Sequence, residues 1–181
     1  MHIRRSVILM LALAAAALPA QDAEGPGKLA PYYPTPSSVV EKMLKIGELK
    51  AGEKMFDLGS GDGRIVIMAA GEFKAEAVGV ELDEDLYKQS SERLRKLGLE
   101  ERARIIHGDI LKQDYSSADL LTVYLLPTSN DRVRPILEEQ LKKGARVVCH
   151  DFDITGWTPE HVEHIEDDGE GRSHTIYLYR R

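Results

Sequence analysis

The residues best suited to chemistry lie in a glycine-rich turn, Asp57-Leu-Gly-Ser-Gly-Asp-Gly63, and at Glu81 just after the next apolar run. The turn follows Met55–Leu58, which is typical of the end of a buried strand, and precedes a helical pattern that begins at Arg64. Glycine tolerates positive φ and lets a ligand approach the backbone closely, so such a turn indicates a nucleotide-type pocket. Glu81 is a carboxylate suited to bind both hydroxyls of a ribose.

The charge around the turn distinguishes between ribose-containing ligands. Dinucleotide sites read G-x-G-x-x-G and place a pyrophosphate at the helix N-terminus. Here the spacing is G-x-G-x-G, with Asp57 before the turn and Asp62 inside it. Two carboxylates would repel a pyrophosphate, which makes an NAD-linked oxidoreductase the least favoured class. A cationic ligand with an α-amino group and a sulfonium suits them better, and S-adenosylmethionine (SAM) is such a molecule. The alternative is a structural turn with solvated aspartates.

The first twenty residues differ from the rest of the chain. A basic start with Arg4 and Arg5 precedes an apolar run, Val7–Leu18, and Pro19-Ala20 precedes polar Gln21. This layout predicts a secretory signal peptide in residues 1–20, and its apolar run is too short to span a bilayer. If it is cleaved, the protein is secreted or periplasmic; otherwise the protein is cytoplasmic. Residues 21–36 are then a flexible lead-in with a Pro-Tyr-Tyr-Pro motif, and residues 37–181 form one domain.

Charge and cysteine content narrow the classes of partner. The chain of 181 residues has a formal charge of −6, which moves to −8 when the leader and its two arginines are removed. An acidic domain is a poor fit to nucleic acid and suits a basic partner, and we expect a monomer. The single cysteine, Cys149, lies in an apolar run and excludes an intramolecular disulfide. No Cys/His cluster in the sequence indicates a metal site.

Apolar runs and helical patterns alternate along the chain, which predicts a mostly parallel sheet with helices on both faces. Thr35 is expected to cap the first helix, with Pro36 at its first position. Asp83 is expected to cap a long helix that runs through Leu97 and is ended by Gly98. A later helix is expected to have Pro135 near its start. The C-terminal part predicts an antiparallel hairpin. The expected strands are 54–58, 77–81, 104–106, 120–125 and 146–150, with 162–165 and 175–179 in the hairpin. Five residues end strands and should meet at one edge of the sheet: Asp57, Glu81, Asp109, Tyr124 and Asp151.

Several motifs together resemble the class I, or seven-strand, SAM-dependent methyltransferases, which have a Rossmann-like doubly wound fold. The chain is most similar to the small protein-lysine N-methyltransferases, among them the archaeal broad-specificity enzymes and those acting on the ATP synthase c subunit. The resemblance runs from Pro31 to Tyr179. Its motifs are Pro31-Tyr-Tyr-Pro-Thr-Pro36, the glycine turn continuing to Arg64-Ile, Val78-Gly-Val-Glu81, Lys143-Gly-Ala-Arg-Val-Val148, His150-Asp-Phe152 and Gly156-Trp157.

The resemblance implies roles for residues around the donor. Asp57 would hold the amino group of SAM, directly or through water, and the N–H groups of Gly59 and Gly61 would face the same end of the molecule. Asp62 adds a carboxylate to that site, and Glu81 would bind the ribose. Asp109 would accept from the adenine amine, or cap the segment at Ile110, and the two roles are compatible.

The resemblance also implies lysine in a protein as the methyl acceptor. Four aromatic residues are candidates for an acceptor channel: Tyr32, Tyr33, Tyr124 and Trp157. For Tyr32 and Tyr33 the alternative role is packing against the core. For Trp157 packing is the favoured role. His150 and Asp151 could orient the acceptor or act as a base, although a lone histidine is more often structural. Tyr124-Leu-Leu-Pro127 replaces the Asn/Asp-Pro-Pro-aromatic signature of nucleic-acid amine methyltransferases. A small-molecule methyltransferase and an exported non-catalytic binding protein are the alternatives.

Overall fold

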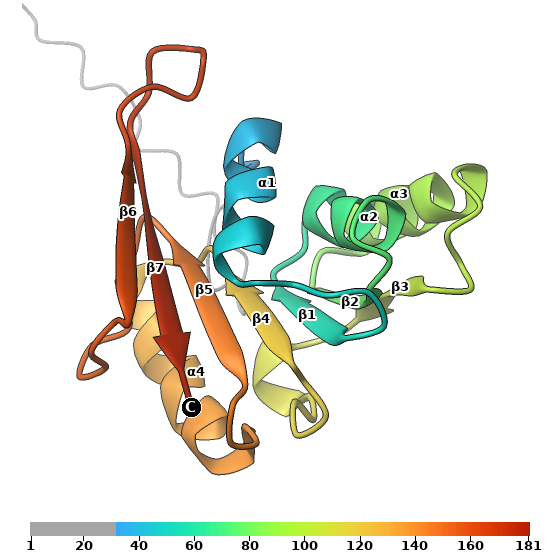
Figure 1. Ribbon diagram of the computed structural model, residues 1–181. Coiled ribbons are helices and arrows are strands. Elements are labelled where there is room, and N and C mark those ends of the chain that lie inside the picture. Colours follow the sequence, from blue (N-terminus) through green and yellow to red (C-terminus); the bar gives the residue numbers. More distant parts are fainter. Residues whose placement is uncertain (1–31) are drawn as a thin grey trace, which may run out of the picture.

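The computed structural model describes residues 32–181, which build a seven-stranded sheet with the strand order β3-β2-β1-β4-β5-β7-β6 (Figure 1). The first five strands in chain order are parallel, and β7 pairs antiparallel with both β5 and β6. The strands are β1 Lys54–Leu58, β2 Glu76–Glu81, β3 Ala103–His107, β4 Leu120–Val123, β5 Arg146–His150, β6 His161–Ile165 and β7 His174–Arg180. The predicted Rossmann-like fold with a C-terminal hairpin is therefore confirmed.

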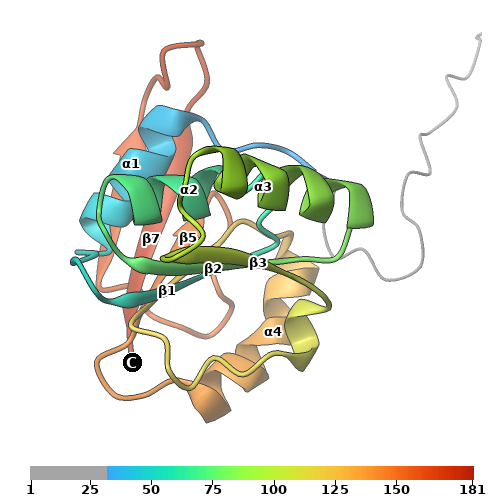
Figure 2. The ribbon, with the colours of Figure 1, turned by 90° about the vertical axis from the view of Figure 1, so that its right-hand side faces the viewer.

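Helices cover both faces of the sheet, and Figure 2 shows α1, α2 and α3 on one side and α4 on the other. The helices are α1 Ser37–Ile46, α2 Arg64–Gly71, α3 Glu84–Lys96 and α4 Pro127–Gln140, with a short 3₁₀ turn η1 Ile110–Lys112. Each face has its own apolar core. One core packs α1, α2 and α3 around Met43 and Met55, and the other packs α4 around Leu137 and Tyr115. Burial of this apolar surface is the main stabilising term for the fold.

Local sequence explains where α3 starts and ends. The Asp83 side chain accepts hydrogen bonds from the N–H groups of Asp85 and Leu86, which satisfies two of the free donors at the helix start. Acidic residues stand in the first turn and Arg93 and Arg95 in the last, as the helix dipole favours. Gly98 follows with φ +66°. This helix agrees with the sequence prediction.

Two helix starts differ from the prediction. Pro36 rather than Thr35 occupies the N-cap of α1, because the hydroxyl of Thr35 is hydrogen-bonded to His150 Nδ1 at 3.2 Å and is not available for the helix. Helix α4 begins at Pro127, so Pro135 lies inside it. Proline at a first helical position needs no N–H donor, and this favours the earlier start. Strand β4 accordingly ends at Val123 instead of 125.

Two smaller findings concern burial and membranes. Cys149 is buried, as its apolar surroundings predict, and burial raises the pKa of its thiol. Within residues 32–181, none of the helices combines the length and the apolar composition that crossing a bilayer requires. The predicted signal peptide, residues 1–20, lies outside the described residues.

Candidate active site

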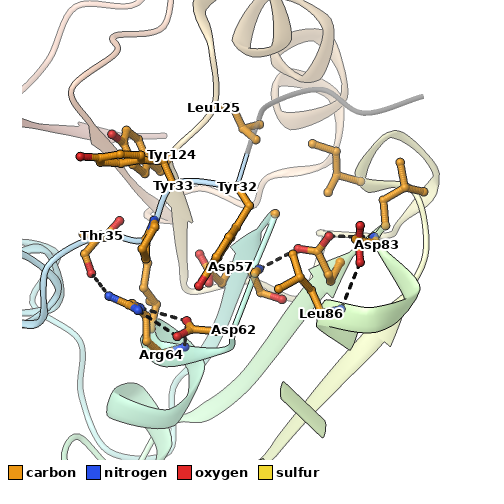
Figure 3. Close-up of a pocket in the computed structure, with 18 of the residues that line it drawn as sticks. Tyr32, Tyr33, Thr35, Asp57, Asp62, Arg64, Asp83, Leu86, Tyr124 and Leu125 are labelled. Atoms are coloured by element: carbon orange, nitrogen blue, oxygen red, sulfur yellow. Dashed lines mark hydrogen bonds and ion pairs between the residues drawn. The ribbon is translucent and has the colours of Figure 1, made fainter. Parts of the chain in front are cut away.

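A pocket opens at the carboxyl edge of the parallel strands, where β1, β2 and β4 end (Figure 3). Its volume is about 900 Å³, including space that is open to solvent. Predicted site residues from distant parts of the chain line it together: Tyr32, Tyr33, Asp57, Gly59, Gly61, Asp62, Glu81, Asp109 and Tyr124. Ligands of parallel α/β sheets bind at this edge, and the fold therefore brings these residues to the expected place.

Asp57 lies at the floor of the pocket, and its side chain is almost fully buried. Thr122 on the neighbouring strand β4 donates a hydrogen bond from Oγ1 to Asp57 Oδ1 at 2.7 Å. Burial, together with the charges of Glu81 and Asp62, raises the pKa of Asp57 to about 7, although the hydrogen bond from Thr122 lowers it. A buried carboxylate among other carboxylates is a site where a cation is stabilised, because the cation relieves both penalties.

Glu81 ends β2 and connects three segments of the pocket. Its Oε2 accepts from the N–H of Gly61 at 2.7 Å, and its Oε1 accepts from the N–H of Asp83 at 2.8 Å. The two bonds fix the carboxylate in the pocket wall. Each carboxylate oxygen can accept a further hydrogen bond, so this geometry leaves capacity for two hydroxyl donors.

The glycine turn is shaped by close contacts. Gly59, Gly61 and Gly63 all have positive φ, and a Cβ on Gly61 would lie 2.7 Å from Tyr32 Cε2. The N–H of Gly59 donates to the carbonyl oxygen of Val80, and the N–H of Gly61 donates to Glu81. Both N–H groups therefore have acceptors within the protein. The glycines shape the pocket here by lacking a side chain rather than by offering free donors.

Asp62 does not stand as an isolated anion. Arg64 donates from Nε and Nη2 to its two oxygens, each at 2.9 Å, and Arg93 Nη1 lies 3.3 Å from it. Burial raises the pKa of Asp62, but the Arg64 guanidinium outweighs this and lowers it. The negative charge that faces a ligand is consequently concentrated on Asp57 and Glu81.

Asp109 both caps the short turn η1 and lines the pocket, as the sequence allowed. Its Oδ1 accepts from the N–H of Leu111 at 2.8 Å and caps η1, while the residue also lines the pocket. Apolar side chains surround this end of the pocket, among them Leu82, Leu86, Ile110 and Leu125. Apolar side chains of this kind suit contact with a flat heteroaromatic ring.

Three tyrosines also line the pocket and form its tyrosine wall: Tyr32, Tyr33 and Tyr124. Tyr32 and Tyr33 are about half exposed, whereas Tyr124 is partly buried. Tyr33 Oη accepts from Arg172 Nη1 at 2.8 Å, and Tyr124 Oη donates to Asp151 Oδ2 at 3.5 Å. Burial, with the nearby charge of Asp151, raises the pKa of Tyr124 to about 12, so it is a neutral phenol at physiological pH.

His150 and Trp157 lie outside the pocket lining. His150 is fully buried behind Tyr124, with ring centroids 4.0 Å apart, and burial lowers its pKa to about 4. It therefore supports Tyr124 as a neutral imidazole and does not face the pocket. Trp157 donates from Nε1 to Glu138 and packs edge-on against Tyr179. The packing alternative for Trp157 is the one that the structure shows.

Sequence reasoning missed three residues at the site. Thr122 holds Asp57, and Arg64 ties Asp62 to the carbonyl oxygen of Thr35. Ser60 lines the pocket, and among the described residues its buried hydroxyl has no hydrogen-bond partner. Ser60 and Arg64 stand in the glycine motif and could have been noticed there. Thr122 could not, because only strand pairing brings it beside Asp57.

Comparisons with known proteins agree with this site. The model of the ANTKMT methyltransferase domain family matches residues 57–161. A protein-lysine N-methyltransferase of Saccharolobus islandicus is 42% identical over 150 residues, which are 82% of this chain and 92% of that protein. The human lysine N-methyltransferase of the ATP synthase c subunit is 32% identical, over 82% of this chain and 60% of its own length.

One solved structure is similar to this chain in both fold and sequence. It is described as an RNA methyltransferase from Salinibacter ruber in complex with S-adenosyl-L-homocysteine. The two chains are 40% identical with a TM-score of 0.75, and the match covers 82% of this chain and 93% of that one. The residues present here fit the related donor SAM: Asp57 would hold its amino group, Glu81 would hold its ribose, and the free hydroxyl of Ser60 would be a further partner. The chain belongs to the ANTKMT methyltransferase domain family and is a SAM-dependent methyltransferase.

Proposed function

We propose that this methyltransferase modifies the side-chain amine of lysine in a protein, and that a basic segment surrounds the lysine. The observation that carries the proposal is the wall of Tyr32, Tyr33 and Tyr124, which lines the same pocket as Asp57 and Glu81. Aromatic faces attract an ammonium group, and their apolar surroundings favour its neutral form. The lysine acceptors in the names of the relatives support the same acceptor.

The chemistry requires few functional groups from the protein. SAM, when bound, supplies a methyl group from its sulfonium. The bond from sulfur to the methyl carbon breaks, a bond from the acceptor nitrogen to that carbon forms, and the sulfonium becomes a thioether. The residues of this chain bind and orient: Asp57 holds the amino group, Glu81 the ribose, and the tyrosines align the acceptor. A lysine ammonium must lose a proton to solvent before its nitrogen can react, and desolvation between tyrosine rings lowers its pKa from about 10.4. Positioning and exclusion of water are the main contributions.

Acidic side chains near the pocket support a basic acceptor. The loop between β6 and β7 carries Glu166, Asp167 and Glu170, all exposed, and Arg172 in the same loop contacts Tyr33. This contact places the loop beside the tyrosine wall of the pocket. A charge reversal, Glu166→Lys, should raise the KM for a lysine-rich acceptor. Glu101→Lys, on the exposed turn before β3 at the other edge, is the matched control, and an equal effect would contradict the proposed docking side.

The acceptor class is tested with the full chain and methyl-labelled SAM. Protein and RNA from cell extract serve as separate acceptors, and labelled protein is hydrolysed to amino acids. Label in Nε-methyl-lysine is the expected result, and the Asp57→Ala, Glu81→Ala double variant should give none. If the label enters only RNA, the activity named for the Salinibacter ruber relative applies and the lysine proposal is wrong. The formal charge of −6 favours the protein acceptor.

We also propose that residues 1–20 direct export and that the mature protein is a monomer. The basic start and the apolar run of Val7–Leu18 support export. A reporter fused after Ala20 should become active outside the cytoplasm, and activity confined to the cytoplasm would assign the enzyme there. Light scattering after gel filtration should give a mass of one chain, and a larger mass would contradict the monomer.

A further inference from the structure

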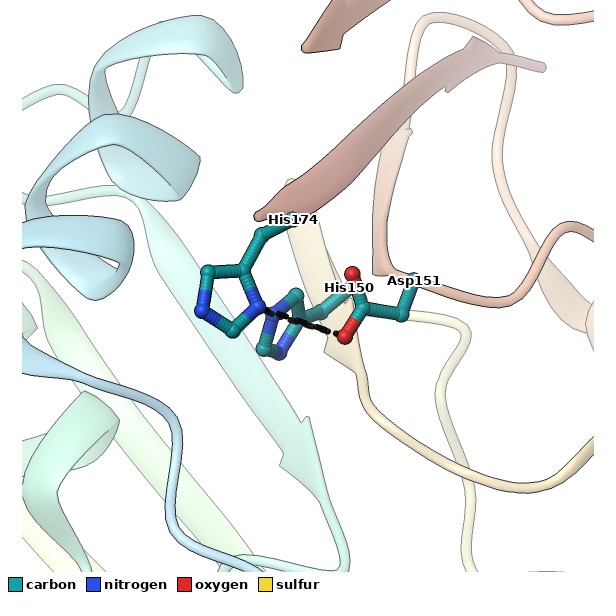
Figure 4. Close-up of side chains that lie close together, drawn as sticks. All are labelled: His150, Asp151 and His174. Atoms are coloured by element: carbon teal, nitrogen blue, oxygen red, sulfur yellow. Dashed lines mark hydrogen bonds and ion pairs between the residues drawn. The ribbon is translucent and has the colours of Figure 1, made fainter. Parts of the chain in front are cut away.

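Three side chains from two segments converge beside the pocket. His150 ends β5, Asp151 follows it directly, and His174 begins β7 (Figure 4). His150 Nε2 lies 2.9 Å from His174 Nδ1, and Asp151 Oδ2 lies 3.3 Å from each of these two nitrogens. Both histidines are buried, and the carboxylate is partly buried. The three atoms therefore form a nearly regular triangle.

The triangle has the size that a small divalent cation requires. Zinc binds histidine nitrogen and carboxylate oxygen at about 2.0–2.2 Å in tetrahedral geometry, which places neighbouring ligand atoms about 3.3 Å apart. The alternative to a cation is a proton shared by the two nitrogens. That proton would join the two rings as a hydrogen-bonded pair, with Asp151 Oδ2 at the same distance from both. A cation at the centre would bind all three atoms. The two equal distances of 3.3 Å from Asp151 Oδ2 favour a shared centre, and the shorter distance of 2.9 Å between the nitrogens is the contact that a hydrogen-bonded pair would also make.

The outer atoms of both histidine rings are held as they are in metal sites. His174 Nε2 lies 3.2 Å from Asp168 Oδ2, and His150 Nδ1 lies 3.2 Å from Thr35 Oγ1. Metal-bound histidines almost always have such a partner on the second nitrogen, which fixes the tautomer and points the free electron pair at the metal. With these partners accepting, Nε2 of His150 and Nδ1 of His174 present their electron pairs to the same point.

The backbone and the local charge agree with this arrangement. Asp151 has φ +58°, an uncommon conformation for a residue with a side chain, and its Oδ1 accepts from the N–H of Thr175. The turn thereby directs Oδ2 toward the two rings. Two carboxylates, Asp151 and Asp168, stand beside the histidines, and Arg172 forms an ion pair with Asp168. A divalent cation would compensate the negative charge of Asp151.

We propose that His150, Asp151 and His174 bind one zinc-type divalent cation, which fastens Thr35, the end of β5 and the start of β7 beside the pocket. Three protein ligands leave a fourth position for solvent. The site is independent of the acceptor class and of the proposed function. Its sequence signal was weak because the two histidines are 24 positions apart and only the pairing of β5 with β7 brings them together.

The test uses the full chain, stripped with a chelator, and zinc alone as the probe. Calorimetry should give about one ion per chain with micromolar or tighter affinity, and zinc should raise the melting temperature. Cobalt(II) should give the visible spectrum of a tetrahedral site. Loss of binding is expected in His150→Ala and in His174→Ala. The variant Asp168→Ala should weaken binding roughly 10- to 100-fold because it removes the outer partner of His174.

The matched control is the double variant His161→Ala, His164→Ala, which removes two exposed histidines from the neighbouring strand β6. It should bind zinc like the unaltered chain. The proposal is wrong if the unaltered chain binds no zinc, and this test does not depend on the folding of any variant. It is equally wrong if the His150 and His174 variants bind as well as the unaltered chain, and the cluster is then a hydrogen-bonded pair that shares a proton.

Discussion

The Arg64 guanidinium donates from Nη1 to the carbonyl oxygen of Thr35 at 2.7 Å, while its other nitrogens hold Asp62 in the glycine turn. One side chain therefore fastens the segment that carries Tyr32 and Tyr33 to the turn that faces the donor. Bonds of this kind, in which the donor is charged, are the stronger ones in proteins. The segment of Tyr32 and Tyr33 and the glycine turn are therefore coupled through Arg64.

Replacing Arg64 by lysine should uncouple the segment of Tyr32 and Tyr33 from the glycine turn. Lysine keeps the charge but cannot bond Asp62 and Thr35 together, because it lacks the planar fork of the guanidinium. We expect a loss of stability of about 2 kcal/mol, visible as a fall of several degrees in melting temperature, and at least a tenfold lower rate of methyl transfer. Calorimetric melting and initial rates measure the two effects.

Arg93→Lys is the control for the Arg64 variant. Arg93 also contacts Asp62, at 3.3 Å, but its side chain is half exposed. Exposed ion pairs contribute little, so stability and rate should change only slightly. If both variants behaved alike, the contact with Thr35 would have no part in the coupling.

The affinity for SAM should depend on the protonation of Asp57. The pKa of this buried carboxyl is raised to about 7, and only its ionised form attracts the amino group of SAM. Below pH 7 binding must release a proton, so the affinity should fall about tenfold for each unit of pH. Calorimetry in buffers of different ionisation enthalpy measures the proton released. An affinity that stays constant from pH 5 to 8 would contradict this assignment.

Asp57→Asn should stabilise the fold while it weakens the donor site. Because the pKa is raised in the folded state, the ionised side chain costs stability, and this cost grows as pH rises from about 4 to about 7. Asparagine keeps an acceptor for Thr122 and removes the charge. Urea unfolding at pH 8 should show a gain of roughly 2–4 kcal/mol that is absent at pH 4, together with a large loss of SAM affinity.

A methyl group on Gly61 should displace Tyr32. The added Cβ would lie 2.7 Å from Tyr32 Cε2, and φ at this position is +53°. Gly98 has a similar φ of +66° with no atom near an added Cβ. Both alanine variants should lose about 1–2 kcal/mol of stability through backbone strain. Only Gly61→Ala should slow methyl transfer by tenfold or more, and equal rates would show that Tyr32 is dispensable.

The gathering of Asp57, the glycine turn and Glu81 around one pocket could be predicted because its signals are local. The glycine turn and Glu81 lie at the ends of adjacent apolar runs, and parallel strands bring such ends together. Alternation of strands and helices likewise predicted the sheet. Asp83 as the cap of α3 followed from residue type alone.

Contacts between distant segments could not be predicted. Thr35 has the residue type of a helix cap, but a histidine more than a hundred positions away engages its hydroxyl. His150 has a residue type common in catalysis, yet the pairing of β5 with β7 buries it behind Tyr124. Pro135 was expected near a helix start, whereas an earlier proline, Pro127, took that place. In each case tertiary packing decided between roles that the local sequence allowed.

The contact between Tyr33 and Arg172 joins positions 139 residues apart. Closing so long a loop costs entropy, and pairings of this range form late when a chain folds. The donor half of the pocket, from Asp57 to Asp109, belongs to neighbouring strand–helix units that can assemble earlier. During refolding, activity should therefore return no earlier than this contact between the two ends of the described chain.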